Sequence, residues 1–231
     1  YNVNTKISHK FKKWLEFGMQ NTANYIKNYQ VPGANLGSTI IARAIEQRPF
    51  DRPFKPNGDY YVGGTDELTR HNPVQIINEQ ETYLDTYRYL GTFYGTVNLG
   101  QDFTFKSSIS TDIGYTYDYK YYNAKHPYGT GVGRLVESNR LIQNILTENI
   151  LTYNKKLKDF SINAIAGHSF QKQNVKNSDV DGGGFPTPSL HVISVASEIY
   201  AASGNTSEYA MESYFGRATF AYQDKYIFTG T

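Results

Sequence analysis

The sequence predicts an all-β chain, specifically an antiparallel transmembrane β-barrel segment of about eight strands. Three observations predict this class: long segments in which apolar and polar residues alternate, many aromatic residues in a polar chain, and connections that alternate between short and long. The chain has 21 Tyr and 13 Phe among 231 residues, yet its mean hydropathy is −0.56. Barrels combine a polar lumen with aromatic girdles at both membrane surfaces, which fits this composition.

The clearest predicted strand runs from Phe103 to Tyr121. Its odd positions read Phe, Phe, Ser, Ile, Thr, Ile, Tyr, Tyr, Tyr, Tyr, and its even positions are polar or Gly throughout. Successive side chains of a strand point to opposite faces, so a period of two indicates one aromatic face and one polar face that contacts water. Globular strands have a modal length of about 5–6 residues and membrane-spanning strands need roughly 9–11, so this run favours a barrel strand that continues beyond the bilayer. The even residues expected to line the lumen are Lys106, Ser108, Ser110, Asp112, Thr116 and Asp118.

The same alternation predicts the other strands. The first two are expected to form a hairpin, and the facing of the segment from Arg140 stays open because it alternates poorly. The remaining predicted strands are Tyr1 to Phe11, Leu15 to Tyr29, Thr82 to Leu99, Arg140 to Tyr153, Phe160 to Gln173, Glu208 to Tyr222, and an eighth that begins at Tyr226.

The predicted connections alternate in length. Short turns fall near Lys12-Lys13, Gly100 to Asp102, Lys155 to Asp159 and Gln223 to Lys225, and long loops at about 30–81, 122–139 and 174–207. Short periplasmic turns and long extracellular loops are typical of outer-membrane barrels. Within the long loops we expect two short helices, Ser38 to Gln47 with Ser38 or Thr39 as N-cap, and Leu190 to Ala202.

The composition argues against several other functions. No cysteine is present, no apolar run approaches the ~20 residues of a membrane helix, and a net charge of +2 offers no basic stripe for nucleic acid. Asp179 to Gly182 resembles the opening of a calcium loop but lacks the later acidic ligands. With no nucleophile elbow or catalytic carboxylate pair, we expect no enzyme activity, no cofactor and no metal site. The histidines are dispersed over the predicted elements: His9, His71, His126, His168 and His191.

Four stretches in order give the chain a family resemblance. The run Ala44 to Phe54, followed by Asn57-Gly58-Asp59-Tyr60, resembles the first extracellular loop of SusC/RagA-type TonB-dependent outer-membrane transporters. The other three stretches are Arg88 to Gly91, Asn149 to Tyr153 with Ala166 to Ser169 after it, and Ser213 to Arg217 running to Asp224-Lys225-Tyr226.

This resemblance implies that the chain forms part of a large barrel of 22 strands in the bacterial outer membrane. It also implies a plug domain inside the barrel, energy from the TonB complex, and a SusD-like surface lipoprotein as partner. The substrate would be an oligosaccharide or an oligopeptide. We expect residues 1–231 to be part of one transmembrane barrel domain, cut at both ends, since the chain starts at Tyr1 without a signal peptide and stops within a strand.

A pocket for a glycan or peptide needs aromatic platforms and hydrogen-bonding side chains. The loop candidates for ligand binding are Phe50, Phe54, Asn57, Asp59, Tyr60, Tyr61, Tyr121, Tyr122 and Tyr128. Arg88 and Arg217, on the inward faces of their strands, are candidates for contact with the plug. The same aromatic residues also suit packing of the loops or the outer girdle.

Two other classes of protein fit part of the pattern. One is a self-contained eight-stranded outer-membrane barrel that acts as an adhesin or anchor, in which strand 1 would pair with strand 8. The other is a soluble carbohydrate-binding β-sandwich with exposed aromatic platforms.

Overall fold

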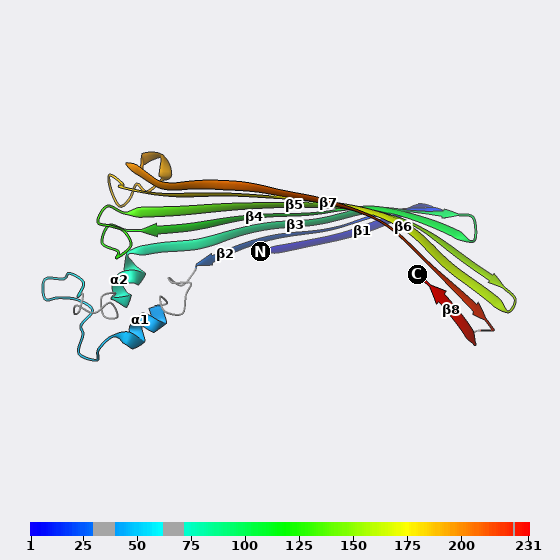
Figure 1. Ribbon diagram of the computed structural model, residues 1–231, viewed down its shortest axis with the longest axis horizontal. Helices are drawn as coiled ribbons and strands as arrows, with labels where there is room; N and C mark the ends of the chain where they lie inside the picture. The colour runs from blue at the N-terminus through cyan, green and yellow to red at the C-terminus, as the bar shows by residue number, and fades with distance from the viewer. Residues whose placement is uncertain (30–39, 62–71, 224) are drawn as a thin grey trace.

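The chain forms one antiparallel sheet of eight strands in sequence order, as Figure 1 shows. The computed structural model describes residues 1–29, 40–61, 72–223 and 225–231. The all-β fold class that the sequence predicts is therefore confirmed. Of the helices in the described ranges, none is both long and apolar enough to cross a membrane.

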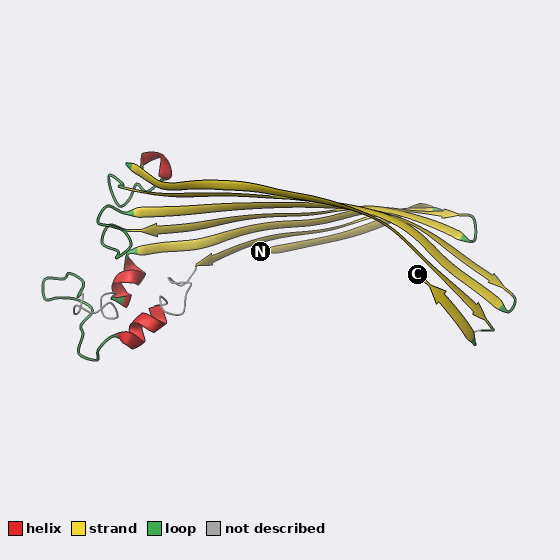
Figure 2. Cartoon of the chain, in the orientation of Figure 1, coloured by secondary structure: helices red, strands yellow, loops and turns green. Residues whose placement is uncertain are grey.

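Long strands make up most of the chain (Figure 2). The helical elements are short, and they lie in the connections. The strands are β1 Asn2–Lys12, β2 Leu15–Tyr29, β3 Gln80–Leu99, β4 Phe103–Tyr122, β5 Arg134–Leu157, β6 Phe160–Gly183, β7 Glu198–Tyr222 and β8 Tyr226–Gly230; the helices are α1 Ile40–Glu46 and α2 Pro73–Asn78, with a 3-10 turn at Ile193–Val195.

The two ends of the sheet differ as the sequence predicts. Short turns join the strands at one end, whereas the segments that carry α1, α2 and the 3-10 turn all lie at the other (Figure 1). We refer to these as the turn end and the loop end. This sorting of connections matches the rims of an outer-membrane barrel.

Three strands are longer than the sequence indicates. β5 and β6 have 24 residues each and β7 has 25, and the expected loops at 122–139 and 174–207 shorten to 123–133 and 184–197. The physical reason is that these extensions mix isolated apolar residues, such as Leu135, Val175 and Ile199, with Asn, Ser, Asp and Gly, so no regular alternation of hydrophobicity marks them. Backbone hydrogen bonding between neighbouring strands forms them instead.

One predicted helix is correct and one is wrong. α1 lies within the segment expected to be helical, although its N-cap candidates Ser38 and Thr39 fall outside the described residues. The helix expected at 190–202 is absent: the segment holds only the 3-10 turn, and from Glu198 it is strand β7. Helix α2 was not predicted; Asn72 caps it by accepting hydrogen bonds from the backbone N–H groups of Val74 and Gln75.

The pairing register gives the sheet two distinct faces. The aromatic face carries the odd residues of β4 and their cross-strand neighbours, and the polar face carries the even residues. On the aromatic face, Tyr1, Tyr25, Tyr87 and Tyr115 form a row across four strands, with ring centroids 6.2, 4.8 and 6.2 Å apart. Nearer the turn end, two aromatic pairs have centroids 4.7 Å apart, Phe103 with Tyr153 and Phe160 with Tyr222. The aromatic face therefore has two aromatic bands at different heights.

Successive hairpins are staggered along the sheet. Leu15 pairs with Val97, and β3 continues two residues further to Leu99. Phe103 pairs with Tyr153, and β5 continues four residues further to Leu157. A stagger in one direction is the shear of strands that tilt relative to a barrel axis.

This topology argues against both alternative classes. A closed eight-stranded barrel requires β1 to pair with β8. Within the described residues, these two strands lie at opposite edges of the sheet and do not pair. The described strands also form a single sheet, whereas a sandwich has two sheets that face each other.

Three cross-strand pairs place an aromatic ring over a glycine. On the polar face, a Cβ atom at Gly18 would come within 2.3 Å of the Tyr94 ring, and one at Gly167 within 2.2 Å of the Phe215 ring. On the aromatic face, Phe17 covers Gly95 in the same way. Because glycine leaves the space that the ring occupies, these rings lie flat on the sheet.

We expect Gly18→Ala and Gly167→Ala each to destabilise the sheet by about 1–3 kcal/mol, because the new methyl group displaces a packed ring. Gly114→Ala on the polar face of β4 is the matched control, since a Cβ atom added there would meet no other atom within 4 Å. Thermal unfolding of the purified protein in detergent, followed by circular dichroism, measures the effect. Equal transition temperatures for the three variants would contradict this packing role.

Candidate functional site

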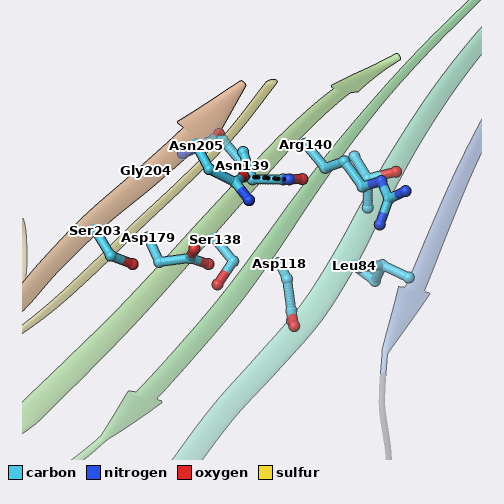
Figure 3. A pocket seen from close by; sticks show the side chains of 11 residues that line it. Leu84, Asp118, Ser138, Asn139, Arg140, Asp179, Ser203, Gly204 and Asn205 are labelled. Atoms are coloured by element: carbon cyan, nitrogen blue, oxygen red, sulfur yellow. Dashed lines mark hydrogen bonds between the residues drawn. The ribbon is translucent and has the colours of Figure 1, made fainter. Parts of the chain in front are cut away.

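A groove with a volume of about 490 Å³ crosses the polar face from β3 to β7 near the loop end (Figure 3). The strand register arranges its side chains in two rows. The first row is Leu84, Asp118, Ser138, Asp179 and Ser203, which pair in succession from β3 to β7. The second row is Thr116, Arg140, Asn177 and Asn205. We call these nine side chains the polar groove.

Charged groups of both signs face this groove. The first row holds two carboxylates on either side of Ser138, and Arg140 lies in the next row. Asp118 accepts a hydrogen bond from Lys120 at 2.5 Å through Oδ2, while its buried Oδ1 has no partner among the described residues. Arg140 forms no ion pair with any described residue, so its guanidinium donors are available to a ligand.

The neutral side chains of the groove are short hydroxyls and amides. Asn177 donates a hydrogen bond of 2.7 Å to Asn205, drawn as a dashed line in Figure 3. Leu84 is the single apolar side chain in the two rows. The groove therefore offers many donors and acceptors and suits a ligand rich in hydroxyl or amide groups.

An aromatic cluster lies at the rim beyond the groove. The ring of His126 is 5.0 Å from that of Tyr122 and 5.5 Å from that of Tyr128, and the backbone N–H of Tyr128 donates to His126 Nδ1. Nearby, Arg134 donates two hydrogen bonds to Asp181, of 2.9 and 2.5 Å. Asp181 belongs to strand β6, so the stretch that resembles a calcium loop is extended and its second carboxylate is already paired.

Tyr121 lies in the apolar core of the loop end. It is 5% exposed and packs with Tyr119 and Leu135, which is fully buried. Residues 184–197 fold over this core: Phe185 and Ile193 pack against it, and the His191 ring stacks on Tyr121 at 3.9 Å between centroids. Tyr121 therefore anchors a loop and does not face the groove.

Four of the candidates in the first long loop lie together. Phe54 and Tyr60 form an isolated β-bridge with their rings 5.4 Å apart. Between them, the Asn57 amide donates to Asp59 at 2.7 Å. The Tyr60 hydroxyl donates to Glu79 at 2.9 Å, and burial together with this hydrogen bond raises the pKa of the Tyr60 phenol. Asn72 also donates to the carbonyl groups of Pro53 and Tyr61, so these contacts join the turn to the two ends of α2.

Tyr61 closes this turn beside the Phe54–Tyr60 bridge, and the remaining candidates lie apart from it. Tyr61 donates its backbone N–H to Pro53, and Phe50 is 74% exposed beside Arg48. Arg88 lies on the polar face, where it forms a bidentate pair with Asp112 at 2.9 and 2.8 Å. Arg217 is on the same face and donates to the Thr231 hydroxyl. His71 lies outside the described residues.

Sequence reasoning missed most of the polar groove. It placed Asp118 and Thr116 on the inward face, but Ser138, Arg140, Asn177, Asp179, Ser203 and Asn205 fell in segments expected to be loops or in the strand whose facing stayed open. The signal that could have found them is the pattern of polar residues two apart on adjacent strands, which requires the register to interpret.

No catalytic arrangement emerges from the described residues. They contain no group of three or more His, Asp or Glu side chains that could hold a metal ion. Long tilted strands, two aromatic bands and an opposite polar face define the class of fold: this chain forms a segment of an antiparallel transmembrane β-barrel wall.

Comparison with known proteins agrees with this class. The chain is 28% identical to TonB-dependent receptor P3 of Formosa agariphila over 242 residues, and 23% identical to TonB-dependent receptor P26 of the same organism. These alignments cover 100% and 99% of the chain but 23% of each relative, so the chain spans about a quarter of their length. No protein-family model matches.

Solved structures share the fold. The chain superimposes on the RagAB peptide transporter with a TM-score of 0.78 at 15% identity, covering 96% of this chain and 26% of that one. For the RagAB peptide importer in its "open-open" state the TM-score is 0.79. The resemblance to SusC/RagA-type TonB-dependent transporters is thereby confirmed. These relatives are receptors and transporters, not enzymes.

We expect Leu135→Ala to release the loop at 184–197, because it removes a fully buried side chain beneath Tyr121 and such cavities typically cost about 2–5 kcal/mol. Limited chymotrypsin digestion should then cleave faster after Leu190. Leu157→Ala at the exposed turn end is the control. Unchanged cleavage in Leu135→Ala would show that this core does not hold the loop.

Proposed function

We propose that this chain is part of the barrel wall of an outer-membrane importer that depends on TonB, with the polar groove facing the transported substrate. The single observation that carries the proposal is the two-faced sheet, with aromatic bands on one face and the groove on the other. The named relatives are TonB-dependent receptors, which supports this placement. As the sequence predicts, the whole chain would belong to one barrel domain.

The spacing of the aromatic bands supports a membrane location for the aromatic face. Along β4, Phe103 and Tyr115 are twelve residues apart, which corresponds to about 40 Å of strand. A strand tilted by about 40° spans roughly 30 Å of membrane over that length, close to the thickness of a hydrocarbon core. The bands would therefore be the two girdles at the lipid headgroups.

The polar groove lies between the loop end and the aromatic band that contains Tyr115. Tyr115 belongs to the girdle, and Thr116 and Asp118 of the groove follow it on the opposite face of β4. A substrate that enters from the extracellular side would thus meet the groove before it reaches the membrane interior. The candidate substrates are an oligosaccharide or an oligopeptide, because the hydroxyl and amide side chains suit both.

The proposed assembly includes parts that lie beyond this chain. A plug domain would fill the barrel, the TonB complex would supply energy, and a SusD-like lipoprotein would cover the loop end. Phe50, Phe54, Asn57, Asp59, Tyr60, Tyr61, Tyr122 and Tyr128 stay candidates for substrate or partner contact at that end. Arg88 and Arg217 stay candidates for contact with the plug, although Asp112 already neutralises Arg88.

We expect Arg140→Gln and Asp179→Asn to reduce substrate uptake roughly ten-fold or more at limiting substrate, since a hydrogen bond to a charged group contributes about 1.5–3 kcal/mol. The test is growth of cells that carry the full-length protein on single oligosaccharides or peptides, with and without TonB. Lys156→Gln is the matched control, because it removes a cation from the polar face of the same strand, at the turn end.

Two results together support the proposal. Cells without TonB no longer grow on one of the substrates, and uptake of that substrate falls in the two groove variants but not in Lys156→Gln. Uptake that does not require TonB would refute the proposed function. Uptake that requires TonB but tolerates both groove variants would keep the importer and remove the groove as its substrate contact.

A further inference from the structure

A second hollow lies on the aromatic face of the sheet, opposite the polar groove. It has a volume of about 590 Å³ and crosses β4 to β7 near the loop end. The strand register arranges its side chains in two rows. The row nearer the turn end is Tyr115, Leu141, Lys176 and Thr206, and the row nearer the loop end is Asn139, Ser178 and Gly204. We call these seven residues the outer pocket.

Small residues create the depression. Apart from its chain neighbours, a Cβ atom added at Gly204 would meet only the backbone of Asn177 and Ser178 within 4 Å, so the space above Gly204 is open. Larger apolar side chains, those of Tyr115 and Leu141, border this space on the side of β4 and β5. The outer pocket therefore suits a compact group with one apolar side, such as a sugar ring.

The outer pocket carries one charged side chain, that of Lys176 on β6. Lys176 is exposed and forms no ion pair with any described residue. The carboxylate of Glu208, in the next row toward the turn end, already has two partners: Lys172 lies 3.7 Å away, and the amide of Asn174 donates a hydrogen bond of 2.8 Å. The ammonium group of Lys176 is thus available to an anionic ligand.

The neutral polar groups of the outer pocket suit the hydroxyl groups of a sugar. The hydroxyl group of Tyr115 donates a hydrogen bond of 2.5 Å to Asn139, which holds this amide at the edge of the pocket. Ser178 and Thr206 add a hydroxyl group each, on either side of Lys176. Hydroxyl and amide groups around one lysine form a site for a phosphorylated sugar, because lysine binds phosphate as a point charge.

The height of the outer pocket places it among lipid headgroups. Tyr115 belongs to the aromatic band near the loop end, which would mark the edge of the hydrocarbon core. Tyr115 is twelve residues from the first residue of β4, whereas Lys176 is sixteen residues from the first residue of β6. Because of this stagger, Lys176 lies farther from the turn end than Tyr115 does, just beyond the hydrocarbon core on the extracellular side.

We propose that the outer pocket binds the phosphorylated sugar headgroup of a glycolipid in the outer leaflet of the membrane. Lys176 would contact the phosphate, and Asn139, Ser178 and Thr206 would contact the sugar hydroxyl groups. Leu141 would meet the apolar side of the sugar ring. This inference rests on the membrane placement within the proposed function and adds a ligand that is not transported.

A lipid is the occupant that fits this location. The outer pocket opens on the face that would meet lipid, and a headgroup is held at that level by its own acyl chains. Its effective concentration beside the pocket is therefore high, so few contacts are enough for binding. Basic pockets at the membrane surface recognise lipid headgroups in the same way, through a cation and a small number of polar groups.

The test is native mass spectrometry of the full-length protein purified in mild detergent. The probes are a diglucosamine lipid with two phosphates, the same lipid without its phosphates, and inorganic phosphate alone. We expect the phosphorylated lipid to bind several-fold more tightly than the dephosphorylated one. Lys176→Gln should weaken its binding roughly ten-fold, since it removes a hydrogen bond from a charged donor. Gly204→Leu should weaken it as well, because the new side chain fills the pocket.

Lys27→Gln is the matched control. Lys27 lies on the same face and in the same row as Asn139, but its ammonium group is 4.0 Å from Asp85 and 4.1 Å from the centre of the Tyr83 ring. We expect this variant to bind the phosphorylated lipid as the unmodified protein does. An equal loss in Lys27→Gln and Lys176→Gln would overturn the proposal, because any cation at this height would then serve.

Three further results would overturn the glycolipid as the occupant. The first is equal binding of the phosphorylated and dephosphorylated lipids. The second is displacement of the lipid by an equal concentration of inorganic phosphate, which would make the ligand a free ion. The third is a cross-link from Ser178→Cys, formed in native outer membranes with a short thiol-reactive reagent, to a second copy or to another protein, because a protein would then cover the pocket.

The readouts separate this inference from the proposed function. Lipid binding that depends on Lys176, in a protein whose uptake does not need TonB, would preserve the outer pocket and refute the importer. Uptake that needs TonB, in a protein that does not bind the phosphorylated lipid, would preserve the importer and refute the outer pocket as a lipid site.

Discussion

Register is the constraint on which the rest of this structure depends. Strands of 20 to 25 residues are hydrogen-bonded along nearly their whole length, and a shift of one strand by one residue would exchange its two faces relative to the rest of the sheet. The antiparallel ladder therefore decides which side chains meet lipid and which meet the interior. The aromatic bands and the polar groove both follow from that one alignment.

The same ladder makes the sheet long enough for two environments. Near the turn end, one face of the sheet is aromatic and the opposite face is polar, as a membrane-spanning barrel wall requires. Near the loop end local contacts hold the two faces: the Arg134–Asp181 pair on the polar face, and the apolar core of Tyr119, Tyr121 and Leu135 on the aromatic face. These contacts hold the long connections in place where lipid no longer does.

The polar groove and the aromatic bands show how two environments can be divided within one sheet. Hydroxyl, amide and charged groups gather on the face that would meet a hydrated ligand, and aromatic rings gather on the face that would meet lipid. Thr116 illustrates the first environment and Tyr115 the second, because consecutive residues of β4 point to opposite faces. Such a division needs no change of backbone geometry, only a change of side chain every second residue.

The sequence by itself determined the fold class, the existence of eight strands, the sorting of short and long connections, and the inward face of β4. It could do so because hydrophobic alternation is strong wherever one face meets lipid and the other meets water. Only the tertiary structure decided the true length of β5 to β7, the absence of a helix at 190–202, the burial of Tyr121 and the assembly of the groove. Those features depend on backbone pairing between distant segments and on a loop that folds over β3 to β5, and neither leaves a periodic pattern in the residues themselves.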